Sequence, residues 1–251
     1  MKPDKKKKDL LMLLCVIGGM SLFAGMTHTP ILLVAIPVYL YLYLDDLDKD
    51  INEDYHKMNN KLTVFLDLDG TIVDWLDKMR KECKLPISAF TQFYENPDSL
   101  TEEAITELFG GENKFRKLMY NRSAKFWYTL DSFWWMEYLI VQLKNNFNEV
   151  AFFTSPGDNP EAGKGKILWQ QKHYPEIPLI MGKHKHLCAG PNKVLIDDNY
   201  RKIGRFIEYG GYGILWPNQF HVAKFNAGRT YSLISDIVAE ILAYQKYHTL
   251  I

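Results

Sequence analysis

Two aspartates separated by one residue, Asp67 and Asp69, follow directly after a short apolar run. Gly70 comes next, and a glycine lets the backbone turn and approach a ligand closely. Two carboxylates placed in this way at the end of a strand can converge on one metal ion and one phosphate group. The pattern therefore predicts metal-assisted phosphate chemistry, although the same short motif also occurs in ordinary turns and in calcium loops.

A second apolar run, residues 149–153, ends in two hydroxyl side chains. Thr154 and Ser155, together with their backbone N–H groups, are suited to holding phosphate oxygens. Twelve residues after Thr154 comes Lys166, in a basic, helix-prone stretch that also contains Lys164. A lysine at this place can neutralise the phosphoryl oxygens and the charged nucleophile. We predict that Lys166 has this role, with Lys164 as the alternative.

A third apolar run, residues 193–196, ends in Asp197 and Asp198. Paired acids form the hard oxygen site that Mg²⁺ prefers. Each of the three runs is typical of a buried strand, and ligands bind at the carboxyl ends of the strands in open α/β sheets. We therefore expect the polar residues that follow the three runs to meet at one edge of a parallel sheet.

The order of these residues resembles the haloacid dehalogenase superfamily of phosphohydrolases. Its four motifs match, in order, Asp67 to Thr71, Thr154, Lys166, and Asp197 with Asp198. The sequence is more closely similar to the 5′(3′)-deoxyribonucleotidase branch, through Phe153 to Pro156, Lys166 with Trp169 and His173, and Leu195 to Asp198. The resemblance covers roughly residues 61–216. The spacing from Thr154 to Lys166 is one residue shorter than that branch leads us to expect.

The resemblance implies an α/β fold with a Rossmann-like three-layer α/β/α core and a small helical cap inserted after the first strand. It implies that Asp67 attacks phosphorus to form an aspartyl-phosphate. Asp69 then protonates the leaving oxygen and later activates water. Mg²⁺ is expected between Asp67, the backbone carbonyl of Asp69 and Asp197, with Asp198 acting nearby or through a water molecule.

Further roles follow from the same resemblance. Thr154 and Lys166 are expected to stabilise charge in the transition state. Trp75 matches an aromatic residue that stacks on the base, and Lys185 matches a basic residue that contacts the substrate phosphate. The implied substrate is a (deoxy)nucleoside 5′-monophosphate, as in deoxyribonucleotide catabolism. The alternatives are a phosphatase for polynucleotide ends or phosphoproteins, and a membrane-bound module that keeps the fold without turnover.

About eighty residues separate the first two motifs, which is too many for a connecting loop. We predict a helical cap at about residues 76–147, with a capping box from Ser99 to Glu102 and a second helix over residues 130–143. Aromatic side chains are dense here, among them Phe126. They are suited either to packing between cap and sheet or to a base-stacking wall over the phosphate site.

The N-terminal residues 1–44 are predicted to form a membrane anchor. Two apolar runs, residues 10–26 and 31–44, flank a turn at Pro30 and read as a transmembrane hairpin of two short helices. Four lysines, residues 5–8, place both ends of the hairpin, and so the catalytic domain, on the cytoplasmic side. A cleaved signal peptide, a single span or signal anchor, and a soluble helical pair are the alternatives. Residues 45–60 read as a charged linker, and residues 61–251 as the phosphatase domain.

The rest of the composition excludes some classes of partner and fold. The formal net charge is zero, so that no stable binding to nucleic acid is expected. Three widely spaced cysteines predict no disulfide framework and fit a reducing compartment. His184, His186 and Cys188 alternate as zinc ligands on a strand would, but they lack a nearby fourth ligand, which favours surface or substrate-facing residues. Residues 212–216 read as a last strand and residues 232–247 as a last helix.

Overall fold

The computed structural model describes residues 62–249 of the chain. The chain divides into two units with the boundary between Met58 and Asn59, and all described residues belong to the second unit. The predicted anchor, residues 1–44, and the predicted linker, residues 45–60, lie outside the described residues and stay predictions. Among residues 62–249, no helix is both long enough and apolar enough to cross a membrane.

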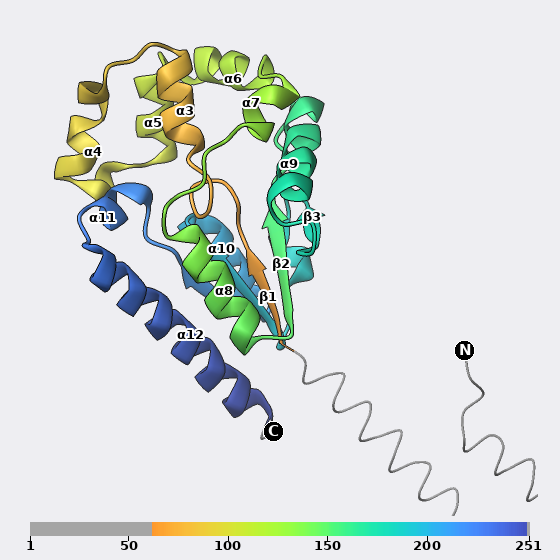
Figure 1. Ribbon diagram of the computed structural model, residues 1–251. Helices are drawn as coiled ribbons and strands as arrows, with labels where there is room; N and C mark the ends of the chain where they lie inside the picture. The colour runs from red at the N-terminus through yellow and green to blue at the C-terminus, as the bar shows by residue number, and fades with distance from the viewer. Residues whose placement is uncertain (1–61, 250–251) are drawn as a thin grey trace, which may run out of the picture. The chain divides into compact units, whose positions relative to one another are not determined.

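Five parallel strands form one sheet in the order β3-β2-β1-β4-β5 (Figure 1). Their bounds are β1 (Thr63–Leu66), β2 (Glu149–Thr154), β3 (Leu179–Met181), β4 (Lys193–Asp197) and β5 (Tyr212–Leu215). β1 is central, and its Leu66 lies opposite Phe152 of β2 and Ile196 of β4. The carboxyl ends of the three predicted strands therefore meet at one edge, and the predicted α/β class with a parallel sheet is confirmed.

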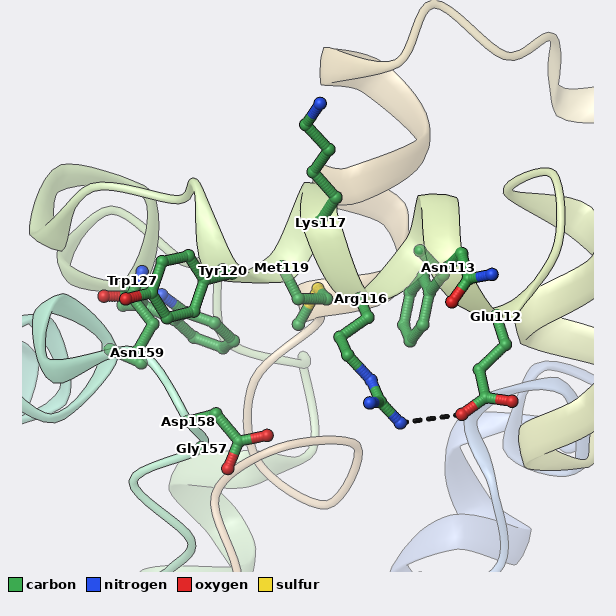
Figure 2. A pocket seen from close by; sticks show the side chains of 12 residues that line it. Glu112, Asn113, Arg116, Lys117, Met119, Tyr120, Trp127, Gly157, Asp158 and Asn159 are labelled. Atoms are coloured by element: carbon green, nitrogen blue, oxygen red, sulfur yellow. Dashed lines mark hydrogen bonds and ion pairs between the residues drawn. The ribbon is translucent and has the colours of Figure 1, made fainter.

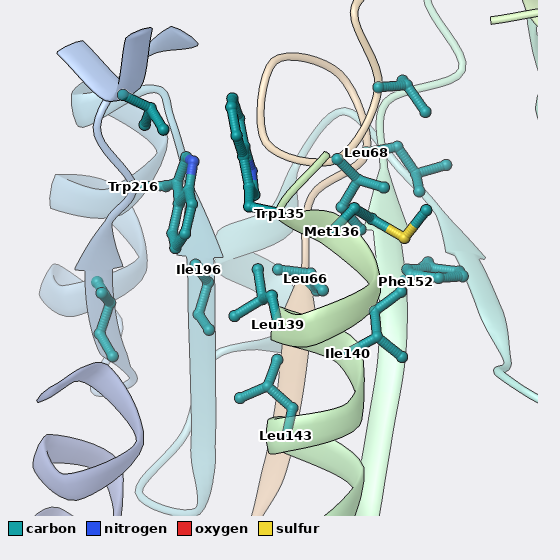
Figure 3. Close-up of a cluster of buried hydrophobic side chains, with 14 of the residues drawn as sticks. Leu66, Leu68, Trp135, Met136, Leu139, Ile140, Leu143, Phe152, Ile196 and Trp216 are labelled. Carbon is teal, nitrogen blue, oxygen red and sulfur yellow. The ribbon is translucent and has the colours of Figure 1, made fainter. Parts of the chain in front are cut away.

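Helices cover both faces of the sheet and give three layers. One face carries α8 (Met136–Asn146), α9 (Pro160–His173) and α12 (Ala227–Thr249), and the other carries α10 (Tyr200–Glu208). Leu66 points into the large cluster under α8 (Figure 3), whereas Phe65 packs edge-on against Phe206 of α10. From β1 to β2 and then to β3 each connection moves the chain toward one edge of the sheet, and from β4 to β5 the connection moves it toward the opposite edge. Because such crossovers are right-handed, the helices of the two sets of connections lie on opposite faces.

A helical cap lies over the carboxyl edge of the sheet (Figure 1). It consists of α3 (Trp75–Glu82), η1 (Ile87–Phe90), α4 (Thr91–Glu95), η2 (Pro97–Ser99), α5 (Glu102–Leu108), α6 (Glu112–Tyr120) and α7 (Ala124–Tyr128). α7 packs directly on α9 at Gly165, where an added Cβ would lie 2.4 Å from the carbonyl oxygen of Ala124 and 2.5 Å from Cβ of Trp127. A glycine is thus required for this close contact, which joins the cap to the core.

Several local predictions were wrong in detail. The helix predicted over residues 130–143 begins only at Met136, because the segment before it pairs with the loop after β1: the N–H of Phe133 donates to the carbonyl oxygen of Ile72 at 2.8 Å. α8 then packs on the sheet. The N-cap of α5 is Thr101, whose hydroxyl accepts from the N–H of Ala104 at 3.1 Å, and not Ser99.

The two elements predicted near the C-terminus are present with shifted bounds. β5 ends at Leu215, one residue before the predicted strand end, and α12 extends beyond the predicted helix of residues 232–247 in both directions. Its apolar side chains Ile234, Ile237 and Ile241 are buried in the cluster shared with α8, which is the sheet-covering role that their spacing predicted.

Candidate active site

Asp67 follows β1 directly and is buried, with 1 % of its surface exposed. Its backbone N–H continues the strand pairing by donating to the carbonyl oxygen of Ile196 at 2.9 Å. The N–H of Leu68 donates to Oδ1 of Asp67 at 2.8 Å. Strand pairing with β4 thus fixes the backbone of Asp67, and the N–H of Leu68 orients its carboxylate.

Asp197 ends the neighbouring strand β4, and Asp198 follows it directly; with Asp67 they form an acidic group. The carboxylate oxygens of Asp67, Asp197 and Asp198 lie within 4.8 Å of one another. Gly70 makes room for this group: its φ is +84°, and an added Cβ would lie 2.0 Å from Oδ2 of Asp198. Only glycine fits there, because a side chain would displace the acid.

Two lysines contact the acidic group: Lys185, which the sequence predicted to contact the substrate phosphate, and Lys202, which it did not single out. Lys185, in the 3-10 helix η3 (Lys185–Cys188), places Nζ 2.8 Å from Oδ1 of Asp67 and 2.7 Å from Oδ2 of Asp197. Lys202, in the first turn of α10, places Nζ 3.2 Å from Oδ2 of Asp67. The charge of Lys166 does lower the pKa of Asp67, as the sequence predicted, but the direct contacts with that carboxylate come from Lys185 and Lys202.

Lys166 instead contacts Asp69 and the hydroxyl of Thr154. Its ammonium group forms an ion pair with Asp69, donates to Oγ1 of Thr154 at 3.1 Å, and donates to the carbonyl oxygen of Ser155 at 2.6 Å. Oδ1 of Asp69 is buried and has no hydrogen-bond partner among residues 62–249. The alternative lysine, Lys164, is exposed on α9.

The three carboxyl groups of the acidic group have pKa values that are shifted in different directions. Burial opposes the ionisation of Asp67, but the ammonium groups of Lys185 and Lys202 outweigh it and hold the pKa of that carboxyl below its ordinary value. Burial, together with the charge of Asp67, raises the pKa of Asp197 to about 6. Burial and the charges of Asp197 and Asp67 raise the pKa of Asp198 well above its ordinary value. Asp67 is therefore a carboxylate at neutral pH, beside acids whose negative charge is not fully compensated.

This donor set fits Mg²⁺. Three carboxylates supply hard oxygen ligands, and their mutual repulsion, visible in the raised pKa values of Asp197 and Asp198, is relieved by a divalent cation. The side chain of Asp69 does not belong to this group, since it pairs with Lys166. Binding of the ion by the backbone carbonyl of Asp69 stays a prediction.

A cleft with a volume of about 910 Å³ opens above the acids, between the sheet edge and the cap. Its floor includes Asp69, Ser155, Lys166, Asp198 and Lys202. The apolar part of its roof, which we call the cap wall, consists of Trp75, Leu100, Ile105, Phe115, Met119 and Trp127. The cap also lines the cleft with polar and acidic residues: Asp98, Thr101, Glu102, Glu103 and Thr106. The polar floor is suited to a phosphate group and the cap wall to an apolar or aromatic body attached to it.

The two aromatic residues proposed as base contacts have different positions. Trp75 lies in the cap wall, with its ring centroid 6.4 Å from that of Phe115. Phe126 is 3 % exposed, packs edge-on against Trp127 and does not line the cleft, so the prediction that it binds substrate is wrong. Packing between cap and core explains Phe126, because α7 lies flat on α9.

A second cavity of about 570 Å³ adjoins the cleft (Figure 2). Residues of α6 and of the loop between β2 and α9 line it, and it shares Phe115, Met119, Trp127 and Gly157 with the cleft. Tyr120 and Arg116 point into it from α6, opposite Asp158 (Figure 2). A ligand held at the acidic group thus has room to extend along the cap.

The segment from His184 to Cys188, for which the sequence favoured surface or substrate-facing residues over zinc, has exposed His184 and Cys188 but a buried His186. His184, His186 and Cys188 do not alternate on a strand, because residues 185–188 form η3. His186 is buried against Tyr209 and lies 3.4 Å from Arg205. Within residues 62–249, the one group of side chains arranged to hold a metal ion is the acidic group.

Lys202 is the functional residue that sequence reasoning missed. Asn199 caps α10 by accepting from the N–H groups of Arg201 and Lys202, and this places Lys202 beside the acids five residues after Asp197. The available signal was a lysine in the first turn of a helix that starts directly after the paired acids.

Comparisons with known proteins return similar structures but no relative in sequence. No family model matches the chain, and no curated protein matches it. A haloacid dehalogenase-like family hydrolase from Xanthomonas campestris has a TM-score of 0.41 at 12 % identity, covering 72 % of this chain and 93 % of that one. A hydrolase from Streptococcus pneumoniae has a TM-score of 0.40 at 12 % identity, covering 66 % and 97 %. A dehalogenase has a TM-score of 0.40 at 14 % identity, covering 66 % and 91 %. At these values the similarities establish neither the family nor the activity of this chain.

Proposed function

We propose that this chain is a Mg²⁺-dependent phosphomonoester hydrolase of the haloacid dehalogenase superfamily, with Asp67 as its nucleophile. The main support is one arrangement of side chains: a buried, ionised Asp67 contacts two lysines and has a carboxylate oxygen within 4.8 Å of one from each of two further acids, of which Asp198 lines the cleft. Titratable groups with strongly shifted pKa values in a cleft are typical of active sites.

In the first step, a carboxylate oxygen of Asp67 forms a bond to phosphorus while the bond from phosphorus to the leaving oxygen breaks. Asp69, which pairs with Lys166 as a carboxylate in the free protein, takes up a proton when the negatively charged phosphate binds and donates it to that oxygen as the alcohol departs. In the second step, Asp69 takes a proton from a water molecule whose oxygen attacks phosphorus. The bond between phosphorus and Asp67 breaks, which releases inorganic phosphate and restores the carboxylate.

The lysines and the metal ion divide the electrostatic work. Lys166 orients Asp69 and Thr154 through its three contacts, and Lys185 keeps Asp67 ionised. Mg²⁺ held by Asp67, Asp197 and Asp198 would supply charge neutralisation for the phosphoryl oxygens. Such preorganised charges account for most of the catalysis of phosphoryl transfer.

The proposed substrate is a (deoxy)nucleoside 5′-monophosphate, as in the 5′(3′)-deoxyribonucleotidase branch. The cap wall supports this, because Trp75 and Phe115 offer aromatic rings above the phosphate site and bases stack on aromatic side chains whatever their identity. Phosphate release from a panel of nucleoside monophosphates and from an aryl phosphate, with Mg²⁺ or EDTA, tests it on the wild type and Asp67→Asn.

Each outcome of that panel is informative. Metal-dependent release from nucleotides that is lost in Asp67→Asn supports both the chemistry and the substrate. Release from the aryl phosphate alone keeps the chemistry and refutes the nucleotide. Absence of release from every substrate refutes the hydrolase and leaves a binding module, and trapping by beryllium fluoride at Asp67 distinguishes a competent nucleophile from such a module.

A second candidate function is the dephosphorylation of a larger ester, such as a polynucleotide end or a phosphoprotein. The cavity beside the cleft favours it, because a substrate longer than one nucleotide has room along α6. We then expect the enzyme to remove the terminal phosphate of an oligonucleotide faster than the phosphate of the mononucleotide. We expect Tyr120→Ala to abolish that preference. Equal rates on both substrates, unchanged in Tyr120→Ala, argue for the mononucleotide.

Attachment to the cytoplasmic side of a membrane through residues 1–44 is a separate proposal, motivated by the two apolar runs of the sequence. Fractionation of cells that produce the full chain or a chain lacking residues 1–44 tests it. Recovery of the full chain in the supernatant contradicts the anchor.

A further inference from the structure

Three lysines surround the reacting carboxylates, and they differ in their access to the cleft. The side chains of Lys185 and Lys166 are 2 % and 4 % exposed, whereas that of Lys202 is 31 % exposed. Lys202 contacts Asp67 and also lines the cleft. Its ammonium group is thus next to the nucleophile and open to a ligand at the same time.

Lys202 contacts the oxygen of Asp67 that we expect to bond to phosphorus. Oδ1 of Asp67 already accepts from the N–H of Leu68 and from Lys185, at 2.8 Å each. Oδ2 is contacted by Lys202 at 3.2 Å. Oδ2 is therefore the oxygen with the freer lone pairs, and an ammonium group beside it is within reach of the oxygens of a phosphoryl group bonded there.

The same ammonium group occupies space that a metal ion needs. Nζ of Lys202 lies 3.2 Å from Oδ2 of Asp67 and 3.5 Å from Oδ1 of Asp197, two oxygens of the acidic group. These distances are longer than the 2.8 and 2.7 Å made by Lys185. A dication between the carboxylates repels the ammonium group, and the half-buried side chain lines the cleft, so that it can move toward the place where we expect the phosphate to bind.

We propose that Lys202 is a substrate-binding residue of this site. In the metal-free protein its ammonium group contacts Asp67 and Asp197, and when the metal ion binds, the side chain turns so that the ammonium group contacts the phosphoryl oxygens instead. The proposal rests on the function proposed above and deepens it, since it assigns a phosphate ligand from α10 in addition to Thr154 and Lys166. Two effects follow: Lys202 weakens binding of the metal and strengthens binding of the phosphate.

Binding measurements test both effects without turnover. Binding of Mn²⁺ is measured by electron paramagnetic resonance, and binding of inorganic phosphate by calorimetry. The full chain is used as the wild type, Lys202→Met, Lys202→Arg and a control, Lys144→Met. Lys144 is an exposed lysine on α8 that pairs with Glu176. We expect Lys202→Met to bind Mn²⁺ several-fold more tightly, and phosphate in the presence of Mn²⁺ about tenfold to a hundredfold more weakly, the range for a hydrogen bond between charged groups. Lys202→Arg keeps most of the phosphate affinity, and Lys144→Met matches the wild type.

The outcomes separate this proposal from the function on which it rests. Phosphate affinity in Lys202→Met within twofold of the wild type overturns the proposal, and so does weaker Mn²⁺ binding, which indicates that the lysine only supports the acids. A thermal melt of Lys202→Met, compared with the wild type, shows whether misfolding causes a loss, and retained affinity in Lys202→Arg argues against it. If the wild type itself binds neither Mn²⁺ nor phosphate, the proposed hydrolase fails together with the role of Lys202.

Discussion

At the carboxyl edge of the sheet the side chains of Asp67, Asp197 and Lys185 are 1 %, 0 % and 2 % exposed, whereas the ion pair between Glu102 of the cap and Arg201 of the core is 64 % and 55 % exposed. Asp67 follows β1, Asp197 ends β4, and Nζ of Lys185 lies within 3 Å of both carboxylates. The cap meets that edge of the core through long side chains in water, with a separation of 3.4 Å for this pair.

The difference teaches which part of the molecule sets which property. Buried charges that are paired are costly to disturb, because removal of one partner leaves the other without compensation. Exposed pairs contribute little. We therefore expect substitutions in the floor to change the chemistry and the stability, and substitutions in the cap to change which substrate is chosen.

The largest effect is expected from Asp69→Asn, which removes the proton donor and leaves the nucleophile in place. The kcat for a nucleotide falls roughly 10²- to 10⁴-fold, the usual contribution of general acid–base catalysis. An aryl phosphate with a nitrophenolate leaving group loses less in the first step, because that group departs without a proton. Equal losses of the burst-phase rate for both leaving groups contradict the role of Asp69 as an acid.

Lys185→Met is the next test, since it removes the charge that keeps Asp67 ionised. We expect kcat to fall about 10²-fold and the free energy of unfolding to fall by about 3 kcal/mol, because two buried carboxylates lose their main partner. Urea unfolding measures the second quantity. The comparison variant is Lys202→Met, whose exposed side chain predicts a smaller loss, and equal stability losses in the two variants refute the distinction.

Asp198→Asn removes a negative charge that burial and two neighbouring acids disfavour. The metal-free variant is expected to be more stable than the metal-free wild type at pH 7. A carboxyl whose pKa is raised in the folded protein lowers stability progressively above its ordinary pKa of about 4, so the advantage of the variant is smaller at pH 5 than at pH 7. Thermal melts at both pH values measure this, and a larger advantage at pH 5 contradicts it.

The same variant tests the metal site. At a Mg²⁺ concentration of 100 times the dissociation constant, the wild type gains about 2.7 kcal/mol of stability. Asp198→Asn gains much less at that concentration, because one of the three carboxylates is missing. An identical Mg²⁺ response in both proteins removes Asp198 from the set of ligands.

Trp75→Ala probes the cap wall rather than the floor. Loss of a stacking surface costs about 1–3 kcal/mol for a base, so KM for a nucleotide rises about tenfold or more, with kcat nearly unchanged. The rate on a small aryl phosphate is the internal control and stays close to that of the wild type. An equal loss on both substrates places Trp75 in the folding of the cap and not in recognition.

Arg201→Ala is expected to have the smallest effect. Its pairs with Glu102 and Glu103, at 3.4 and 3.5 Å, join the cap to α10 at the rim of the cleft. Exposed pairs contribute about 1 kcal/mol or less and weaken in salt. The variant and the wild type should therefore have melting temperatures that converge in high salt, and a difference that persists there assigns Arg201 another role.

The strands of the site and the polar residues at their ends could be predicted from the local pattern of the sequence. Apolar, β-prone runs before Asp67, Thr154 and Asp197 define buried strands, and hydropathy alone places the polar residue after the last apolar one. Parallel strands linked by helical connections bring such ends to one edge. The length between the first two motifs likewise predicted the helices that cover this edge.

The choice of lysine was not predictable in this way. Lys166 was favoured because it follows Thr154 closely, yet the contacts with Asp67 come from Lys185 and from Lys202, which is 135 positions away. Phe126 was a candidate for stacking because of its type, and close packing of α7 on α9 at Gly165 buries it instead.

The sequence by itself determined the strands, the acids at their ends and the presence of a cap, because these depend on the hydropathy of neighbouring residues. Only the tertiary structure decided which cations meet which acids and which aromatic rings face the cleft. Those contacts depend on strand order, on the short helix η3 between β3 and β4, and on the depth to which α7 packs against α9. Such distances between segments are set by the packing of the whole domain, and no local pattern encodes them.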